Sequence, residues 1–161
     1  LYYVKRYFDK REMVRLVHDH FDNVEQIATS PTMKQNNWRI AITTNEHYYV
    51  GKAENGHIII LDEFPRQTIP EDDPIMTRAM EDHNIKAFLS FSPVYRWEMT
   101  YYNEHTEVRF IDLRYRSRGR YPFVAVAQTD DSTLEIMNSY TGWVFTEEKL
   151  KSKLDPVPVD S

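Results

Sequence analysis

The chain has 161 residues, a length that fits one domain of ordinary size. Its 41% share of hydrophobic residues predicts a globular protein with a sizeable core, while a net charge of -5 and a pI near 5.7 argue against nucleic-acid binding through bulk positive charge. The absence of cysteine excludes disulfide bonds, thiolate metal sites and cysteine nucleophiles.

The first residues have the composition of a membrane-proximal segment. The chain begins at Leu1 rather than methionine, which indicates a missing upstream segment, and residues 1–8 are aromatic with two adjacent cations. No apolar run approaches the roughly 20 residues that cross a bilayer. We therefore expect residues 1–8 to be an interfacial or linker segment, 9–154 a single α+β domain and 155–161 a mobile tail. The alternative for residues 1–8 is the start of an ordinary amphipathic helix.

The first half of the chain predicts one helix followed by a meander of strands. Met13, Val14, Val17 and Phe21 recur at helical spacing, which predicts a helix from about residue 9 to 22. Apolar and polar residues then alternate in several short runs, and Asn55 with Gly56 favours a two-residue hairpin turn. The predicted strands are 24–29, 38–43, 48–53 and 57–61.

The second half predicts further helices and strands. Asp73 followed by Pro74 fits a helix N-cap and first position, and glutamates at 147 and 148 suit the first turn of a terminal helix. The complete prediction is an α+β fold with an antiparallel, largely meander-type sheet of about six to seven strands and two to four helices. The elements expected here are helices near 74–80, 85–91 and 147–154, and strands 95–102, 106–116, 121–129 and 134–140.

Candidate metal ligands are few and weak. His18 and Asp22 are four residues apart and would share one face of the predicted first helix. His47 and His105 each end an Asn-Glu-His turn, and these two turns would bring their side chains together only at the same end of one sheet. Solvated surface side chains are the favoured interpretation. We therefore expect no cofactor and no metal site in this chain.

No catalytic motif is present in the sequence. A Gly-x-Ser-x-Gly nucleophile turn is absent, and the four glycines are too widely separated for a phosphate-binding loop. An acid–base pair assembled from the 25 acidic residues stays open, because sequence alone does not show which of them meet in space. The catalytic residues are therefore unknown at this stage.

The most distinctive stretch is a row of arginines near the end of the predicted strand 106–116. If the strand continued, its arginines would all point to one face and could contact anionic lipid headgroups or the phosphates of a nucleic acid. The alternative is a solvated strand edge in which the arginines pair with Asp112, Asp130 or Asp131. The residues of this predicted anionic-surface site are Arg114, Arg116, Arg118 and Arg120.

Short motifs spread over most of the chain carry a family resemblance. They are Asn37-Trp38 after Pro31, Ala87-Phe88-Leu89-x-Phe91-Ser92, Val108-x-Phe110-x-Asp112-Leu113-Arg114-Tyr115, Tyr121-Pro122-Phe123 and Asn138-x-Tyr140-x-Gly142-Trp143. These motifs resemble the C-terminal region of the bacterial YdjM/YfhP-like family of membrane-associated, metal-dependent hydrolases.

The resemblance carries expectations about the rest of the protein. It implies an upstream region of transmembrane helices that holds the divalent metal and its ligands, so no metal ligand of the family is carried over to this chain. It also implies that the chain lies at the cytoplasmic face of the membrane, with its own membrane-embedded N-terminal region as a partner. Anionic lipid is the further partner that the arginine row suggests.

Two functions follow as hypotheses. In the first, the chain is a non-catalytic accessory or regulatory module, with the arginine row near lipid or a partner. In the second, it supplies substrate-binding groups such as Arg114, Arg116 or His105 to a hydrolase site completed by the membrane region. A pocket lined by convergent polar groups would favour the second, and a flat cationic face near the N-terminus the first. A signalling role through protein contacts is a weaker third hypothesis.

Overall fold

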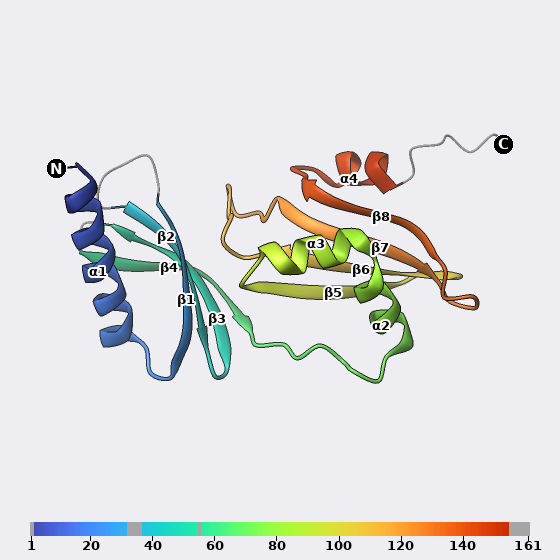
Figure 1. The fold of residues 1–161 in the computed structure, drawn as a ribbon, viewed down its shortest axis with the longest axis horizontal. Helices are drawn as coiled ribbons and strands as arrows, with labels where there is room; N and C mark the ends of the chain where they lie inside the picture. Colours follow the sequence, from blue (N-terminus) through green and yellow to red (C-terminus); the bar gives the residue numbers. More distant parts are fainter. Residues whose placement is uncertain (1, 32–36, 55, 155–161) are drawn as a thin grey trace. The chain divides into compact units, whose positions relative to one another are not determined.

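The computed structural model describes residues 2–31, 37–54 and 56–154. The chain divides into two compact units, residues 1–66 and 67–161, where the sequence suggests a single domain over 9–154. Each unit contains a four-stranded antiparallel sheet whose strands are joined in sequence order (Figure 1). The described residues form eight strands and four helices, which confirms the α+β class and the meander pairing.

The first unit is one helix followed by four strands. Helix α1 spans Tyr2–His20, so residues 2–8 are part of the first helix. It ends two residues earlier than predicted, and Asn23 with φ of 59° turns the chain toward the sheet. The turn predicted at Asn55–Gly56 is described only at Gly56, which has φ of 80°, because Asn55 lies outside the described residues, as does the predicted tail 155–161. The strands are β1 (Val24–Pro31), β2 (Asn37–Thr44), β3 (His47–Glu54) and β4 (His57–Pro65).

The core of the first unit forms between α1 and one face of its sheet. Met13 and Val17, one helical turn apart, are buried against alternate residues of β2. Figure 1 shows the helix running alongside these strands. The alternation along β2 therefore marks one buried face of the strand, as the sequence predicts. The buried residues of that face are Trp38, Ile40 and Ile42.

Gly51 lies at a bulge between β3 and β4. The register shifts after Val50, and a Cβ atom placed on Gly51 would lie 2.2 Å from the carbonyl oxygen of Ile59. Backbone atoms give way less easily than a side chain, so only glycine fits this close approach.

Gly51→Ala is expected to lower the free energy of unfolding of the first unit by about 1–3 kcal/mol, because β4 must move to relieve the clash. The measurement is urea unfolding followed by the NMR amide signals of β2 and β3. Lys52→Ala is the matched control, since this exposed neighbour contributes only a surface ion pair to Glu54. Equal stability of the two variants would contradict the steric account.

Two short helices open the second unit. Helix α2 (Pro74–Glu81) is capped by Asp73, whose carboxylate accepts hydrogen bonds from the amides of Ile75 and Met76 at 2.9 and 3.0 Å, as predicted. Asp82 caps α3 (His83–Phe91) in the same way. The remaining elements are β5 (Tyr95–Tyr101), β6 (His105–Asp112), β7 (Phe123–Asp130), β8 (Ile136–Trp143) and α4 (Glu147–Leu154).

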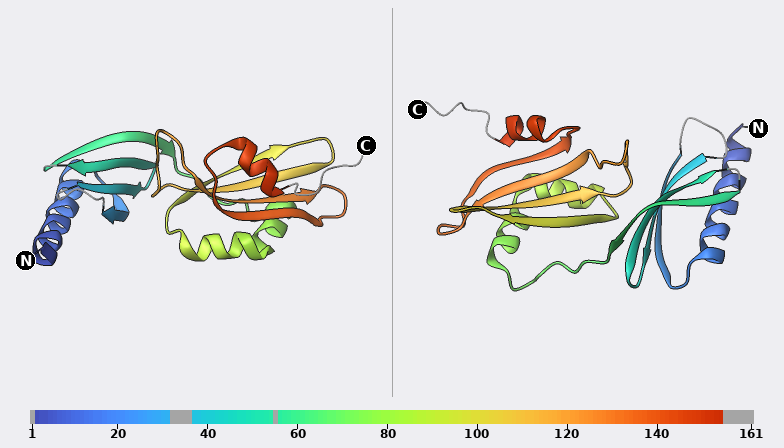
Figure 2. Two further views of the ribbon diagram at one scale, coloured as in Figure 1. Left: turned by 90° about the horizontal axis from the view of Figure 1, so that it is seen from above. Right: turned by 180° about the vertical axis from the view of Figure 1, so that it is seen from behind.

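The two faces of the second sheet have different covers. On one face, α2 and α3 pack Met76, Ile85 and Phe88 against apolar residues of β6 and β7. Seen from behind in Figure 2, the strands of this sheet lie in front of α3. On the other face, α4 packs Leu150 and Leu154 against the opposite residues of the same strands. Because α4 is short, it leaves room for polar side chains on its face of the sheet.

Candidate functional site

The predicted arginine row does not lie on a strand. Strand β6 ends at Asp112, and residues 113–122 form a connection to β7 that we call the arginine loop. Within it, Ser117 and Arg120 exchange backbone hydrogen bonds across a tight turn in which Arg118 and Gly119 have φ of 52° and 78°. The prediction of a strand through residue 116 was therefore wrong, and the arginines do not form a single strand face.

Arg114 is held by a fully buried carboxylate. Asp112 has 0% of its side chain exposed and accepts hydrogen bonds from Ser92 Oγ at 2.5 Å and from the backbone amide of Arg114 at 2.8 Å. The guanidinium of Arg114 donates to the same carboxylate, with Nη2 at 2.8 Å from Oδ2. Burial acts to lower the pKa of Arg114, but the hydrogen bonds and charge of Asp112 outweigh it and raise this pKa above its ordinary value. Of the predicted acidic partners, Asp112 is the one that Arg114 uses.

Aromatic rings surround Arg114 and are exposed at this end of the unit. The guanidinium carbon lies 4.8 Å from the ring centroids of both Phe91 and Tyr115. Tyr115 contacts Trp143 at 4.9 Å between centroids, and half or more of Phe91 and Trp143 is exposed. We call Phe91, Tyr115, Phe123 and Trp143 the aromatic surface; Phe123 joins it to the core by stacking on Phe88 at 5.5 Å.

The charge around the arginine loop is one-sided. From residue 113 to residue 129 the sequence has four arginines and neither aspartate nor glutamate. Arg118 and Arg120 are exposed, and Arg116 is half-buried. Asp130 ends β7 and Asp131 follows it in the turn to β8; Asp130 accepts hydrogen bonds from Ser132 and Thr133, and Asp131 accepts one from Thr106. The loop is therefore a cationic segment in a chain whose net charge is -5.

The structure places the predicted metal ligands in different units and elements. His47 lies in the first sheet and contacts Glu63 at 3.4 Å, whereas His105 lies in the second sheet and stacks on Tyr102. Asp22 follows the end of α1, so it does not share a helical face with His18. Within the described ranges no three histidine, aspartate or glutamate side chains form a group able to hold a metal ion.

A cavity of about 360 Å³ lies at the start of α4. Its polar wall contains Arg109 from β6, Arg120 from the arginine loop and Glu147 from α4. Thr146 caps the helix by accepting a hydrogen bond from the amide of Lys149 at 3.2 Å, which fixes the first turn over the sheet. The apolar wall is formed by Tyr121, Val124, Val144, Phe145 and Leu150.

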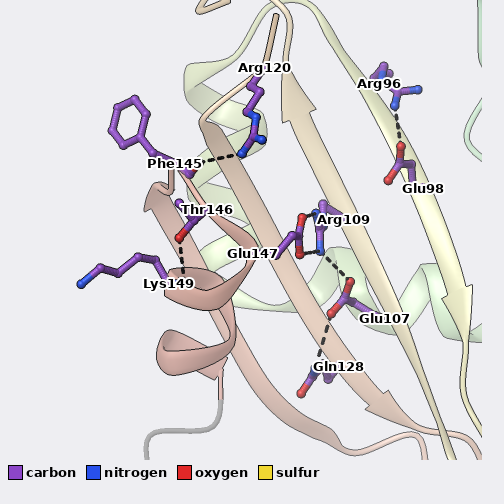
Figure 3. A network of polar contacts seen from close by, with 10 residues as sticks. All are labelled: Arg96, Glu98, Glu107, Arg109, Arg120, Gln128, Phe145, Thr146, Glu147 and Lys149. Atoms are coloured by element: carbon purple, nitrogen blue, oxygen red, sulfur yellow. Dashed lines mark hydrogen bonds and ion pairs between the residues drawn. The ribbon is translucent and has the colours of Figure 1, made fainter. Parts of the chain in front are cut away.

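Arg109 lies between two glutamates (Figure 3). It forms a two-bond fork with Glu147, with Nη1 to Oε1 at 2.8 Å and Nη2 to Oε2 at 3.2 Å. It also donates to Glu107 at 3.1 Å, and Gln128 donates to the other oxygen of Glu107 at 3.4 Å. The side chain of Glu107 is 9% exposed and that of Glu147 is 70% exposed, so the two partners differ in burial.

The same contacts shift the pKa values of the fork. Burial acts to lower the pKa of Arg109, but the hydrogen bond to Glu147 and the charges of both glutamates raise it overall. The pKa of Glu147 is lowered, chiefly by the hydrogen bond from Arg109. A lowered carboxyl pKa means that the pair stabilises the fold at neutral pH and that this contribution is lost as the pH falls through the folded-state pKa of Glu147.

Sequence reasoning missed Arg109, Glu107 and Glu147 as a group. The available signal was local: Glu107 and Arg109 alternate with Val108 and Phe110 in a central strand, a pattern that normally indicates one solvated face. The structure covers part of that face with α4, whose first residue is 38 positions from Arg109.

The fold and the site define the class of the protein, an α+β protein with two meander sheets and a cationic loop on the second. The chain belongs to the YfhP family: residues 22–64 match the YfhP middle domain and residues 74–154 match the YfhP C-terminal alpha/beta plait domain. These two matches cover β1 to the penultimate residue of β4 and α2 to α4.

The chain is similar to a protein of Bacillus subtilis (strain 168) that is named "Uncharacterized protein YfhP". The two are 54% identical over 145 residues, which cover 90% of this chain and 43% of that protein. The chain thus spans less than half the length of this relative and corresponds to its middle and C-terminal domains. No solved structure matches the chain. Among the described helices, none combines the length and the apolar character that crossing a membrane requires.

Proposed function

We propose that this chain is the accessory, non-catalytic module of a longer, membrane-anchored, metal-dependent hydrolase, and that its arginine loop contacts anionic lipid headgroups at the cytoplasmic face. The observation that carries the proposal is the cationic, acid-free arginine loop beside the exposed aromatic surface. Arginine side chains attract anionic lipid, and tryptophan and tyrosine favour the depth of the headgroups. The divalent metal and its ligands belong, in this proposal, to the membrane region.

The overall negative charge of the chain does not oppose this contact. At physiological salt, charges are screened over about 8 Å, so the acidic residues of distant elements act weakly on a lipid surface that touches the arginine loop. Arg114 is bound to Asp112, whereas Arg118 and Arg120 are exposed at the turn of the loop and are the cations best placed to meet headgroups.

The double variant Arg118→Ala/Arg120→Ala is expected to bind anionic vesicles about 30-fold more weakly than the parent chain at low salt, since each arginine near the surface contributes about 1 kcal/mol. The measurement is co-sedimentation with phosphatidylcholine vesicles that contain phosphatidylserine. Arg114 is left unchanged because its loss would disturb the buried Asp112.

Lys52→Ala/Lys86→Ala is the matched control, because it removes two exposed cations outside the arginine loop. Its binding should stay within twofold of the parent, and pure phosphatidylcholine vesicles should bind neither variant. Equal weakening by both double variants would show that total charge, and not the loop, governs binding, and would remove the proposal.

A second candidate function is favoured by the cavity at α4. It brings Arg109, Arg120 and Glu147 together over an apolar wall, as a substrate-binding site would. Of the residues suggested from sequence for this role, Arg114 is engaged with Asp112 and His105 with the ring of Tyr102. In this function the chain would hold an anionic substrate for chemistry performed by the membrane region.

A further inference from the structure

Arg109 binds the carboxylate of Glu147 in the geometry with which an arginine binds an anionic ligand. A guanidinium that donates two parallel hydrogen bonds to a carboxylate uses the same donors that bind a ligand carboxylate or phosphate. Glu147 is well exposed and begins a helix of eight residues near the end of the described chain, so its side chain can leave the fork without disturbing the sheet.

Arg109 would keep its position without Glu147. Its third hydrogen bond goes to Glu107, which is buried and also receives a hydrogen bond from Gln128 on β7. The guanidinium is therefore held in place by Glu107 of the sheet, and its other hydrogen bonds are directed at the first turn of α4. A cation fixed in this way is preorganised, which lowers the cost of binding an anion.

The cavity provides the other features of an anion site. Arg120 is a second cation in its wall and donates to the carbonyl oxygen of Phe145 at 3.4 Å, a long contact that an oxyanion would replace. The volume of about 360 Å³ falls within the range of ligand pockets. Tyr121, Val124 and Phe145 offer an apolar wall for the body of a ligand.

We propose that the cavity at α4 binds a small organic oxyanion, a carboxylate or phosphate monoester with an apolar body, and that Glu147 occupies the anion position when the ligand is absent. The ligand headgroup replaces the Glu147 carboxylate on Arg109, with Arg120 as the second cation. Glu147 thereby competes with the ligand from within the chain. This inference deepens the second candidate function, on which it rests, by naming the class of ligand and by giving Glu147 the role of competitor. It depends on Arg109 and Glu147, which the lipid contact does not use.

The test is an NMR titration of the chain with phenyl phosphate, which combines an oxyanion with an apolar ring. Glu147→Gln is expected to bind about tenfold more tightly than the parent, because a charge-assisted hydrogen bond no longer competes for Arg109. Glu148→Gln is the matched control: it removes the same charge from the neighbouring position and should bind like the parent. The shifted amide signals should include Arg109, Thr146 and Leu150.

A second variant removes the charge of Arg109 without leaving Glu107 as an unpaired buried carboxylate. Glu107→Leu/Arg109→Met replaces the ion pair with apolar side chains and should lose binding while keeping the NMR spectrum of a folded protein. Equal affinities of Glu147→Gln and Glu148→Gln would overturn the proposal. Binding by Glu107→Leu/Arg109→Met with parental affinity, or no binding by Glu147→Gln, would also overturn it, and would leave the fork as a structural strap for α4.

Discussion

Replacing Asp112 with alanine is expected to lower the free energy of unfolding of the second unit by about 3–5 kcal/mol. The carboxylate is fully buried and satisfies three groups at once: the hydroxyl of Ser92, the backbone amide of Arg114 and its guanidinium. Its loss leaves the positive charge of Arg114 without a counter-charge in a site where that side chain is only 16% exposed. The measurement is urea unfolding followed by the amide signals of β6 and β7.

The matched control is Asp72→Ala, the same truncation at an exposed position before α2, which should change the stability by less than about 0.5 kcal/mol. Asp112→Asn should fall between the two, because the amide oxygen still accepts hydrogen bonds but carries no charge. A loss as small as that of Asp72→Ala would mean that water reaches Arg114 and Ser92 in the folded protein.

The same carboxylate explains why the end of β6 was mispredicted. The alternation of Ile111, Leu113 and Tyr115 continues the strand pattern past the last paired residue. Asp112 accepts a hydrogen bond from the amide two residues ahead, which competes with the backbone ladder and turns the chain. Arg118 then adopts a positive φ, which is uncommon for a residue other than glycine, and this closes the turn. The hydrophobic pattern of the sequence does not predict such a turn.

Local chemistry made other elements predictable. The cap at Asp73 and the proline after it depend on neighbours within three residues, and the structure confirms them. The hairpins of the first sheet follow from alternation and short turns, so β2 and β3 begin within one residue of the prediction. The division of the strands between two sheets depends on which strands pair, and the hydrophobic pattern of a single sequence does not carry that information.

The candidate cavity, like the division into two sheets, depends on contacts between residues far apart in the sequence. Arg109 and Glu147 are 38 residues apart, and each by itself is an ordinary charged residue on a strand or in the first turn of a helix. Their contact exists because Leu150 and Leu154 seat α4 on Ile111 and the neighbouring residues of β7. Long-range packing therefore creates the site, whereas the composition of the arginine loop was visible in the sequence from the start.

Arg109→Met is expected to destabilise the second unit by about 3 kcal/mol, chiefly through Glu107. The carboxylate of Glu107 is only 9% exposed, and the variant leaves it with a long hydrogen bond from Gln128 and without the guanidinium. Glu147→Gln should cost less than about 1 kcal/mol, although Glu147 makes two of the three hydrogen bonds, because its side chain is exposed and its charge can be solvated. Urea unfolding followed by the amide signals of β6 and β7 measures both variants.

The double variant Glu107→Leu/Arg109→Met separates charge from packing. A buried ion pair replaced by apolar side chains of similar size is often neutral or stabilising, so this variant should recover most of the stability lost in Arg109→Met. If the double variant is as unstable as Arg109→Met, the lost stability lies in the contact of Arg109 with α4 and not in the uncompensated charge of Glu107. Arg109 would then hold the helix in place, and a ligand that displaced Glu147 would have to loosen α4 in order to bind.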